Sequence, residues 1–226
     1  MKYPGVFFTA VAALVLCFTG CMTTETSRAL ETPQTQAAAR PFQGPRAPIA
    51  VGNFDNRSNF MRGLFSDGTD RLGSQAQTIL MSHLTLTNRF VVLDRANMDE
   101  IMREAEIRGE AQELIGAAYV ITGDVSEFGR REVTTLAFFG ILGRGRQQVA
   151  YSRVNLNVVD TRTGAVVFSA QGAGEYALSD MEVLGFGTVA GFDSTLNGKV
   201  LDLAIREAVD RLAEAIDNGI WNPAGI

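Results

Sequence analysis

Two long glycine-bearing segments, on either side of the short strand pattern Val154–Val159, constrain this chain more than any other feature. The first covers residues 131–151 and the second covers 175–195, and each is long enough for two strands and a turn. Strands of about 9–11 residues cross a bilayer when they are tilted. We therefore expect two β-hairpins, with turns at Gly143-Arg144-Gly145 and in the region 187–191.

The residue pattern of the first arm leaves the surroundings of these hairpins open. A membrane strand alternates apolar outward positions with polar inward ones. Here apolar residues occupy both the odd-numbered and the even-numbered positions. The odd-numbered ones are Val133, Ala137, Phe139 and Ile141, and the even-numbered ones are Leu136, Phe138 and Leu142. The pattern by itself therefore favours solvated hairpins over inserted ones. The charged residues of the region do not separate lumen from rim; they are Arg130, Arg131, Arg144, Arg146, Asp180, Glu182 and Asp193.

The first twenty residues predict a secretory signal peptide. Lys2 supplies a basic start, and the apolar run 6–18 is too short to span a bilayer as a helix. The run ends in Phe18-Thr19-Gly20-Cys21, which resembles a bacterial lipobox. Cys21 is then the lipidation site, carrying covalent diacylglycerol and an amide-linked acyl chain such as palmitate. An ordinary signal peptide with a chance cysteine is the alternative.

The sequence after the cysteine suggests where the chain is anchored. Several acyl chains hold a protein to a membrane more stably than one. Met22 stands where inner-membrane lipoproteins usually show aspartate, so by resemblance to sorted lipoproteins we expect the bacterial outer membrane, with the folded part in the periplasm. Residues 21–46, rich in Thr, Gln, Ala and Pro, predict a lipidated flexible tether.

Residues 47–221 are expected to form one α/β domain, with membrane hairpins at about 130–153 and 174–198 and a short tail at 222–226. The formal charge of −5 becomes −6 when Lys2 is removed, so the mature chain offers no basic surface to nucleic acid. Cys17 lies in the signal peptide and Cys21 is lipidated, which leaves no thiol for a disulfide. We expect no cofactor beyond the covalent lipid.

Apolar spacing predicts the order strand, helix, strand, helix, strand, hairpin, helix. The fold class is therefore α+β: a mixed sheet flanked by helices, with two inserted hairpins. The expected elements are strands at 48–54, 89–95 and 118–128, a hairpin of 154–159 with 165–171, helices at 69–88 and 201–215, a helix whose apolar face is Met98, Ile101, Met102 and Ala105, and a short helical piece at 110–115. Asp67 or Thr69 is the expected cap of the first helix, and Asn88 its stop.

The sequence gives no sign of an enzyme. His83, the only histidine, lies beside the apolar stripe of the first helix, where a packed role is more common than a catalytic one. No second histidine, cysteine or carboxylate stands at metal-ligand spacing. A phosphate-binding loop, a nucleophile elbow and a clustered acid pair are all missing from the sequence.

Several motifs, in their order and spacing, resemble the curli secretion channel lipoproteins, the CsgG family, together with the related holdfast-attachment protein HfaB. The resemblance covers nearly all of residues 48–221. The motifs are Arg89-Phe-Val-Val-Leu-Asp-Arg, Ala118-Tyr-Val-Ile-Thr-Gly-Asp-Val, Phe139-Gly-Ile-Leu-Gly, Val154-Asn-Leu-Asn-Val-Val-Asp-Thr-Arg-Thr-Gly and Asp217-Asn-Gly-Ile-Trp.

The resemblance implies an outer-membrane lipoprotein that forms a nonameric ring. Each protomer would donate two hairpins to one oligomeric transmembrane β-barrel, which exports unfolded fibre or adhesin subunits by diffusion. Accessory proteins on either side of the membrane are further expected partners. A physical argument agrees: four strands of one chain cannot close a barrel, so inserted hairpins require several copies. The residues expected in the membrane hairpins are Phe138, Phe139, Ile141, Val149, Tyr151, Leu184, Phe186, Val189 and Phe192.

The resemblance also implies a pore constriction in the loop between the first strand and the first helix. Ser58-Asn59-Phe60 matches part of the family motif, which makes Asn59 and Phe60 the candidates. No tyrosine precedes them and the loop is longer than in the curli channel, so Phe65 is a third candidate. A loop aromatic packed against the core is the alternative for Phe60 and Phe65.

Two functions of different classes follow. The preferred one is an outer-membrane secretion channel for curli-like or holdfast-attachment subunits, with a role in fibre assembly and cell adhesion. The alternative is a non-inserting periplasmic lipoprotein that docks on and activates an envelope partner, with the two segments as surface hairpins.

Overall fold

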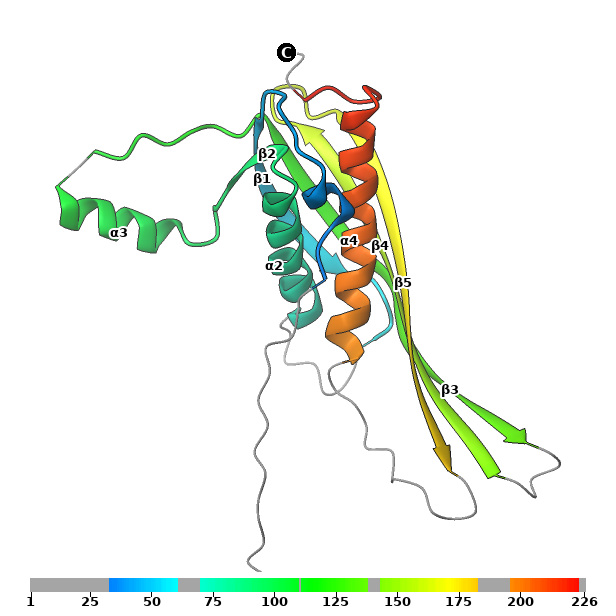
Figure 1. Ribbon diagram of the computed structural model, residues 1–226. Coiled ribbons are helices and arrows are strands. Elements are labelled where there is room, and N and C mark those ends of the chain that lie inside the picture. Colours follow the sequence, from blue (N-terminus) through cyan, green and yellow to red (C-terminus); the bar gives the residue numbers. More distant parts are fainter. Residues whose placement is uncertain (1–32, 61–69, 110, 138–142, 183–195, 224–226) are drawn as a thin grey trace, which may run out of the picture. The chain divides into compact units, whose positions relative to one another are not determined.

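The computed structural model describes residues 33–60, 70–109, 111–137, 143–182 and 196–223. These residues build one five-stranded sheet in the order β2-β1-β3-β4-β5 (Figure 1). The strands are β1 (Ala47–Asn56), β2 (Phe90–Leu93), β3 (Tyr119–Ala137), β4 (Gly143–Asp160) and β5 (Val166–Glu182). β1 pairs in parallel with β2 and β3, whereas β3, β4 and β5 pair antiparallel. The predicted α+β fold with a mixed sheet is confirmed.

Two long helices, α2 (Arg71–Leu86) and α4 (Leu196–Asp217), cover one face of this sheet (Figure 1). Their apolar stripes are the ones that helical spacing predicted, and they form the core with the inward residues of the strands. The buried stripe residues are Leu72, Ala76, Leu80 and Leu84 of α2 and Leu201, Ile205, Ala208 and Leu212 of α4. The third helix, α3 (Met98–Arg108), buries none of its residues. The sheet is therefore covered by helices on one face only.

A glycine in β5 sets how closely α4 approaches the sheet. A Cβ atom at Gly172 would lie 2.0 Å from the carbonyl oxygen of Ala204 in α4. No side chain fits at that distance, so the helix backbone rests directly on the strand. This close contact fixes α4 along β5, next to the region that the sequence predicted to leave the core.

The end of α4 is held by a buried arginine. The Arg89 guanidinium, 1% exposed, donates from Nε and Nη2 to the two carboxylate oxygens of Asp217 at 2.8 and 2.7 Å. Its Nη1 donates to the carbonyl oxygens of Ala37 and Thr87 at 3.1 and 2.8 Å. Arg89 thus joins the N-terminal segment, the end of α2 and the end of α4. Trp221 stacks nearby on Phe168 and Phe90.

Part of the predicted tether is structured. Gln36–Ala39 forms a short 3-10 helix, η2, in which Ala37 is buried. The backbone N–H groups of Gln36 and Ala37 donate to the carboxylate of Asp210 in α4 at 3.1 and 3.0 Å. The expectation of a flexible tether over all of residues 21–46 is therefore wrong for this stretch, which belongs to the same compact unit as the sheet.

Three further local predictions differ from the structure. Residues 111–117 form no helix, so the short helical piece predicted at 110–115 is wrong over its described part. Gly143-Arg144-Gly145, predicted as a turn, lies in β4. The N-cap of α2 is Asp70 in place of Asp67 or Thr69. Asn88 does end α2 as predicted, with a left-handed φ of 56°.

None of the helices in the described part of the chain is both long enough and apolar enough to cross a membrane.

Candidate functional site

Three strands continue together beyond the helix-covered core. The pairing of β1 with β3 ends at Val125, and the β3–β4 register shifts immediately afterwards, between Val125 and Glu127. Such a bulge bends and twists a strand pair. Beyond it, residues 127–137, 143–153 and 173–182 remain paired; we call these three strand segments the strand extension (Figure 1).

The strand extension contains the described parts of both predicted hairpin segments, and residues 183–195 of the second segment lie outside the described residues. β3 and β4 do pair across the first predicted segment, up to Ala137 opposite Gly143. The second segment, however, begins as an uninterrupted continuation of β5 and pairs with β4 as far as Arg144 opposite Glu182. The two segments are therefore joined in one sheet that grows out of the core strands, because no break in pairing separates them from it.

The register sorts the charged residues of the strand extension. Arg144 lies opposite Glu182, and Arg146 lies opposite Asp180. Residues alternate between the two faces of a sheet, so these four positions share one face. From the row of Val133, Gln147 and Ser179 outward, the opposite face carries no charged residue among the described positions, which are Val133, Thr135, Ala137, Gly143, Gly145, Gln147, Ser179 and Met181. One row closer to the core, the same face carries Arg131 beside Val149 and Ala177.

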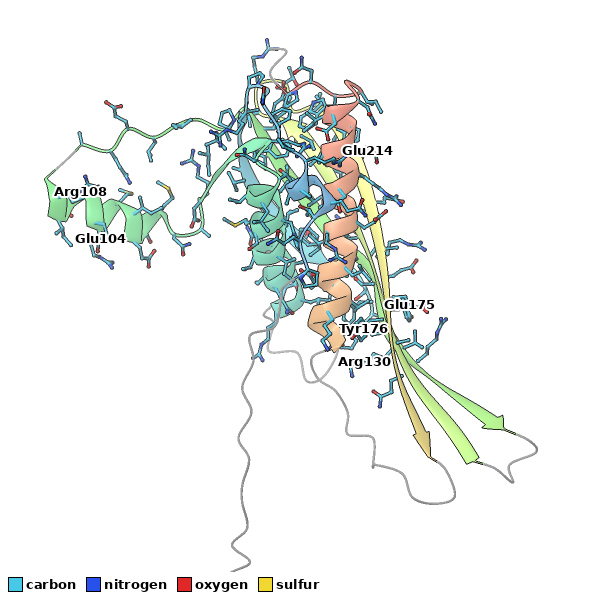
Figure 2. The ribbon with its side chains drawn as sticks, viewed as in Figure 1. Glu104, Arg108, Arg130, Glu175, Tyr176 and Glu214 are labelled. Atoms are coloured by element: carbon cyan, nitrogen blue, oxygen red, sulfur yellow. The ribbon has the colours of Figure 1, made fainter. Side chains whose placement is uncertain are left out.

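Polar contacts tie the base of the strand extension to α4. Arg130 Nε donates to Asn197 Oδ1 at 2.8 Å, and the Lys199 ammonium lies 5.2 Å from the Tyr176 ring centroid. Arg130, Glu175 and Tyr176 all lie at this junction of strands and helix (Figure 2). The ion pair of Arg131 with Glu175, at 3.0 Å, joins β3 to β5. Both of its side chains are more than half exposed, so it adds little stability.

Two of the predicted membrane residues lie in the described part of the strand extension. Val149 is 4% exposed and Tyr151 is 37% exposed, and both are in β4 near its base. Cys21, Phe65, Phe138, Phe139, Ile141, Leu184, Phe186, Val189 and Phe192 lie outside the described residues.

The loop that follows β1 starts where the strand extension begins. Val125 is the last β3 residue that pairs with β1. The N–H groups of Arg57 and Ser58 both donate to its carbonyl oxygen at 3.0 Å. The Asn56 side-chain oxygen then accepts from the Ser58 N–H and hydroxyl, and its amide donates to the Phe60 carbonyl at 2.9 Å. The first four loop residues are thus held in a fixed turn.

Asp70 joins the two ends of the same loop. Its carboxylate accepts from the Asn56 N–H at the end of β1 and from the Gly73 N–H in the first turn of α2, at 2.6 and 2.8 Å. A Cβ at Gly73 would lie 2.1 Å from the Phe54 carbonyl oxygen, so this approach requires glycine. The bond between Asp70 and Asn56 was not predicted from the sequence. A helix cap involves neighbouring residues and can be read locally, whereas a bond to the end of β1 depends on how the chain folds.

The predicted constriction residues have different surroundings. Asn59 is exposed, whereas the Phe60 ring is half-buried against the core, with its centroid 4.6 Å from that of Phe128. In the single chain Phe60 therefore holds the loop against the base of β3, which is the packed alternative stated from the sequence. A constriction formed by Asn59, Phe60 or Phe65 stays a prediction.

His83 has the packed position that was predicted for it. It is 4% exposed, and its Nε2 lies 2.8 Å from the Asp202 carboxylate of α4. Among the described residues, no three His, Cys, Asp or Glu side chains gather as metal ligands would.

The chain that forms this helix-covered sheet matches the model of a known protein family over most of its length. The model of the family described as "Curli production assembly/transport component CsgG" matches residues 30–224. The chain belongs to the CsgG family. The resemblance seen in the sequence motifs is thereby confirmed.

A protein of Neisseria meningitidis serogroup B (strain ATCC BAA-335 / MC58), named "Putative lipoprotein NMB1126/NMB1164", is 57% identical over 213 residues, which is 94% of this chain and 95% of that protein. Among solved structures, the PelC dodecamer from Paraburkholderia phytofirmans is 16% identical, covers 82% of this chain and 97% of that one, and has a TM-score of 0.36. Lipoprotein GNA1162 from N. meningitidis is 18% identical, with 77% and 97% covered and a TM-score of 0.34. No conclusion about this chain rests on such low structural scores.

The packing of Phe60 leads to a prediction about stability. Phe60→Ala removes the ring that contacts Phe128, so we expect the free energy of unfolding to fall by about 1–2 kcal/mol, less than for a fully buried phenylalanine. Asn59→Ala, at the exposed neighbouring position, is the control and should change it by less than about 0.5 kcal/mol. Urea unfolding of the purified variants measures both. Equal effects of the two substitutions would contradict the packed position of Phe60.

Proposed function

We propose that this chain is the lipid-anchored subunit of an oligomeric secretion channel in the outer membrane, which exports unfolded fibre or adhesin subunits by diffusion. The observation that carries this proposal is the outer part of the strand extension, where, from the row of Val133, Gln147 and Ser179 outward, the charged positions lie on one face only. The family to which the chain belongs is described as a curli production assembly and transport component, which supports the same function.

The dimensions of the strand extension suit a bilayer. Each of its three strand segments has about ten residues, the length of a tilted membrane strand. From the row of Val133, Gln147 and Ser179 outward, the face with Arg144, Arg146, Asp180 and Glu182 would line a water-filled lumen, and the other face would contact lipid. The exposed ion pair of Arg131 with Glu175, closer to the core, would then lie at the boundary of the membrane. The mixed apolar pattern noted in the sequence is compatible with this arrangement, because charge, more than apolarity, separates the two faces.

The open edges of the strand extension require several copies. Beyond Val125, β3 has a described partner only on its β4 side, and β5 likewise pairs only with β4 among the described strands. Unpaired backbone groups are not tolerated in the hydrocarbon core of a membrane. If the strands insert, a neighbouring copy must therefore supply the missing partner of β3, and the chain must form a ring.

The same end of the sheet holds the candidate constriction. The first residues of the loop after β1 are bonded to Val125 of β3, where the strand extension leaves the core. In a ring this loop would therefore lie at the mouth of the barrel. Asn59 is exposed there and Phe65 lies further along the loop. We assign the narrowing to these residues together with Phe60, which anchors the loop. The anchor to the membrane would be the lipid on Cys21, in agreement with the name of the meningococcal relative.

Adjacent threonines in β3 provide a matched test of the two faces. Thr134→Arg adds a charge to the charged face, and Thr135→Arg adds one to the uncharged face. An arginine facing lipid costs about 2–4 kcal/mol at the bilayer midplane, a cost that every subunit of a ring would bear. In planar bilayers we expect channels from the unmodified protein and from Thr134→Arg, with selectivity shifted toward anions, and few or none from Thr135→Arg.

Two results would contradict the proposal. A folded, lipidated, unmodified protein that forms no channels would favour a periplasmic lipoprotein that activates an envelope partner. Equal conduction by both arginine variants would show that the two faces of the strand extension do not correspond to lumen and lipid.

The constriction is tested by conductance. Asn59→Ala and Phe65→Ala shorten side chains that we place in the narrowing, so single-channel conductance should rise in at least one of them. Leu86→Ala, at an exposed position of α2, is the control and should conduct like the unmodified protein. Unchanged conductance in both loop variants would exclude these two residues from the narrowing.

A further inference from the structure

An aliphatic row crosses the sheet face that α2 and α4 leave uncovered. Direct register pairs connect one residue from each strand, in the order Leu93, Ala50, Val120, Val159 and Val166. Their neighbours Ile49, Val51, Ile121 and Val158 belong to the core under the helices, so these five point to the other face. We call these five residues the aliphatic row.

The aliphatic row is an interruption in an otherwise polar surface. Val166 is 59% exposed, and Leu93, Val120 and Val159 are half-buried. Two residues further along the strands this face becomes polar, with the Ser169 hydroxyl donating to Asn157 Oδ1 at 2.7 Å and the Asn155 amide donating to Asp124 at 2.9 Å. That part is suited to water, whereas the aliphatic row is suited to cover by another apolar surface.

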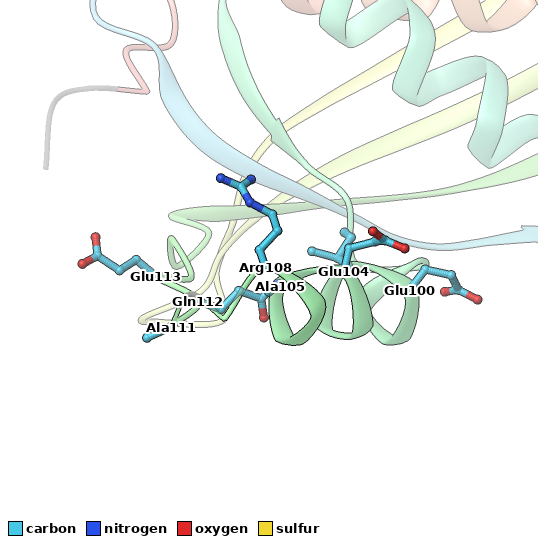
Figure 3. Close-up of a pocket in the computed structure, with 8 residues that line it drawn as sticks. Glu100, Glu104, Ala105, Arg108, Ala111, Gln112 and Glu113 are labelled. Carbon is cyan, nitrogen blue, oxygen red and sulfur yellow. The ribbon is translucent and has the colours of Figure 1, made fainter.

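Helix α3 carries a matching apolar stripe that nothing in the described chain covers. Met98, Ile101, Met102 and Ala105 recur at helical spacing, yet Ile101 is 38% and Met102 is 55% exposed. α3 makes no extensive contact with any other helix or strand in the described residues. The shallow pocket along α3 is closed on one side only by the chain that follows it, at Ala111 and Gln112 (Figure 3).

The topology assigns α3 to the face of the aliphatic row. The crossover from β1 to β2 through α2 and the crossover from β2 to β3 through α3 run in opposite directions across the sheet. Parallel crossovers are right-handed almost without exception, so the two helices belong on opposite faces. α2 covers the core face, and α3 therefore fits the other one. The structure shows that it does not cover that face of its own sheet.

The charges around the two surfaces differ. Residues 98–113 contain six acidic and two basic side chains, a net of −4, and Glu100 and Glu104 lie along one edge of α3 (Figure 3). The ends of the aliphatic row carry both signs: Asp94 and Arg95 follow β2, and Asp160 and Arg162 lie at the β4–β5 turn. The Arg95 guanidinium donates to the Ile115 carbonyl of its own chain, which leaves the exposed Arg162 as the cation that can meet the acidic edge of α3. Hydrogen bonds from Thr163 and Arg162 lower the pKa of Asp160 and keep its carboxylate ionised beside Arg162.

We propose that α3 of one copy docks on the aliphatic row of a neighbouring copy. The donor and acceptor surfaces are different patches of the same chain, and such head-to-tail contacts close into rings. The inference rests on the oligomer of the proposed function and specifies how adjacent subunits are held on the side of the sheet away from α2 and α4. Apolar cover would stabilise the contact, and the acidic flank of α3 would face Arg162.

Disulfide trapping between differently tagged chains tests this directly. Full-length Met102→Cys carries one tag and full-length Val166→Cys carries another, and the two are produced together and oxidised in membranes. A disulfide requires Cα atoms within about 7 Å, so only direct docking permits it. We expect a mixed-tag dimer as the main oxidised product and its loss on reduction. Met102→Cys with Leu86→Cys, an exposed position on α2, is the control and should give none.

The other possible outcomes test the docking of α3 and the channel function separately. Conducting rings without the mixed-tag disulfide would overturn the docking of α3 and leave the channel intact. A disulfide within one chain of the Met102→Cys/Val166→Cys double variant, in place of one between chains, would also overturn it, because α3 would then cover its own sheet. A mixed-tag dimer from a protein that forms no channels would support the docking and contradict the channel.

Discussion

Backbone pairing between β3, β4 and β5 is the interaction on which the rest of this structure depends. It begins under α4, passes the bulge after Val125 and continues without a gap to Ala137 opposite Gly143. The helices cover only the first part of these strands, so the second part is held by its own hydrogen bonds and by its base. Among the described residues, the outer edges of β3 and β5 are unpaired in this ribbon, and exposed strand edges of this length tend to pair with another strand.

The opposite end of the domain supplies a rigid base. Arg89 and Asp217 form a bidentate ion pair that also reaches the carbonyls of Ala37 and Thr87. A buried ion pair contributes to stability only when its remaining donors are satisfied, and here they are. The pair fixes the end of α4, while Gly172 lets the helix rest on β5. The ion pair thus fixes one end of α4, and the bond of Asn197 to Arg130 joins the other end to the strand extension.

Much of the fold could be predicted because its signals are local. Residues close together in the sequence determine the apolar stripes of α2 and α4 and the turn between β4 and β5. The structure confirms these predictions. The joining of the two glycine-bearing segments could not be predicted, because strand pairing depends on partners far away in the sequence. Gly143 to Gly145 resembled a turn since glycine is typical of turns, but continued pairing with β3 and β5 keeps it extended.

For the candidate site as well, the local motifs could be predicted and the long-range contacts could not. Asn59 and Phe60 were found from a short motif, but the ring contact with Phe128 required the strand register that brings them together. The apolar stripe of α3 was predicted from the spacing of Met98, Ile101, Met102 and Ala105. Its exposure shows that helical periodicity predicts an apolar face without saying which chain covers it.

The central claim is that copies of this chain close a shared barrel with their strand extensions. The mass and shape of the lipidated protein, extracted in mild detergent, test it most directly by light scattering and negative-stain imaging. The account predicts a large ring with a central stain-filled hole and a mass of many subunits. A monomer or dimer that is released from membranes by mild washing would contradict it.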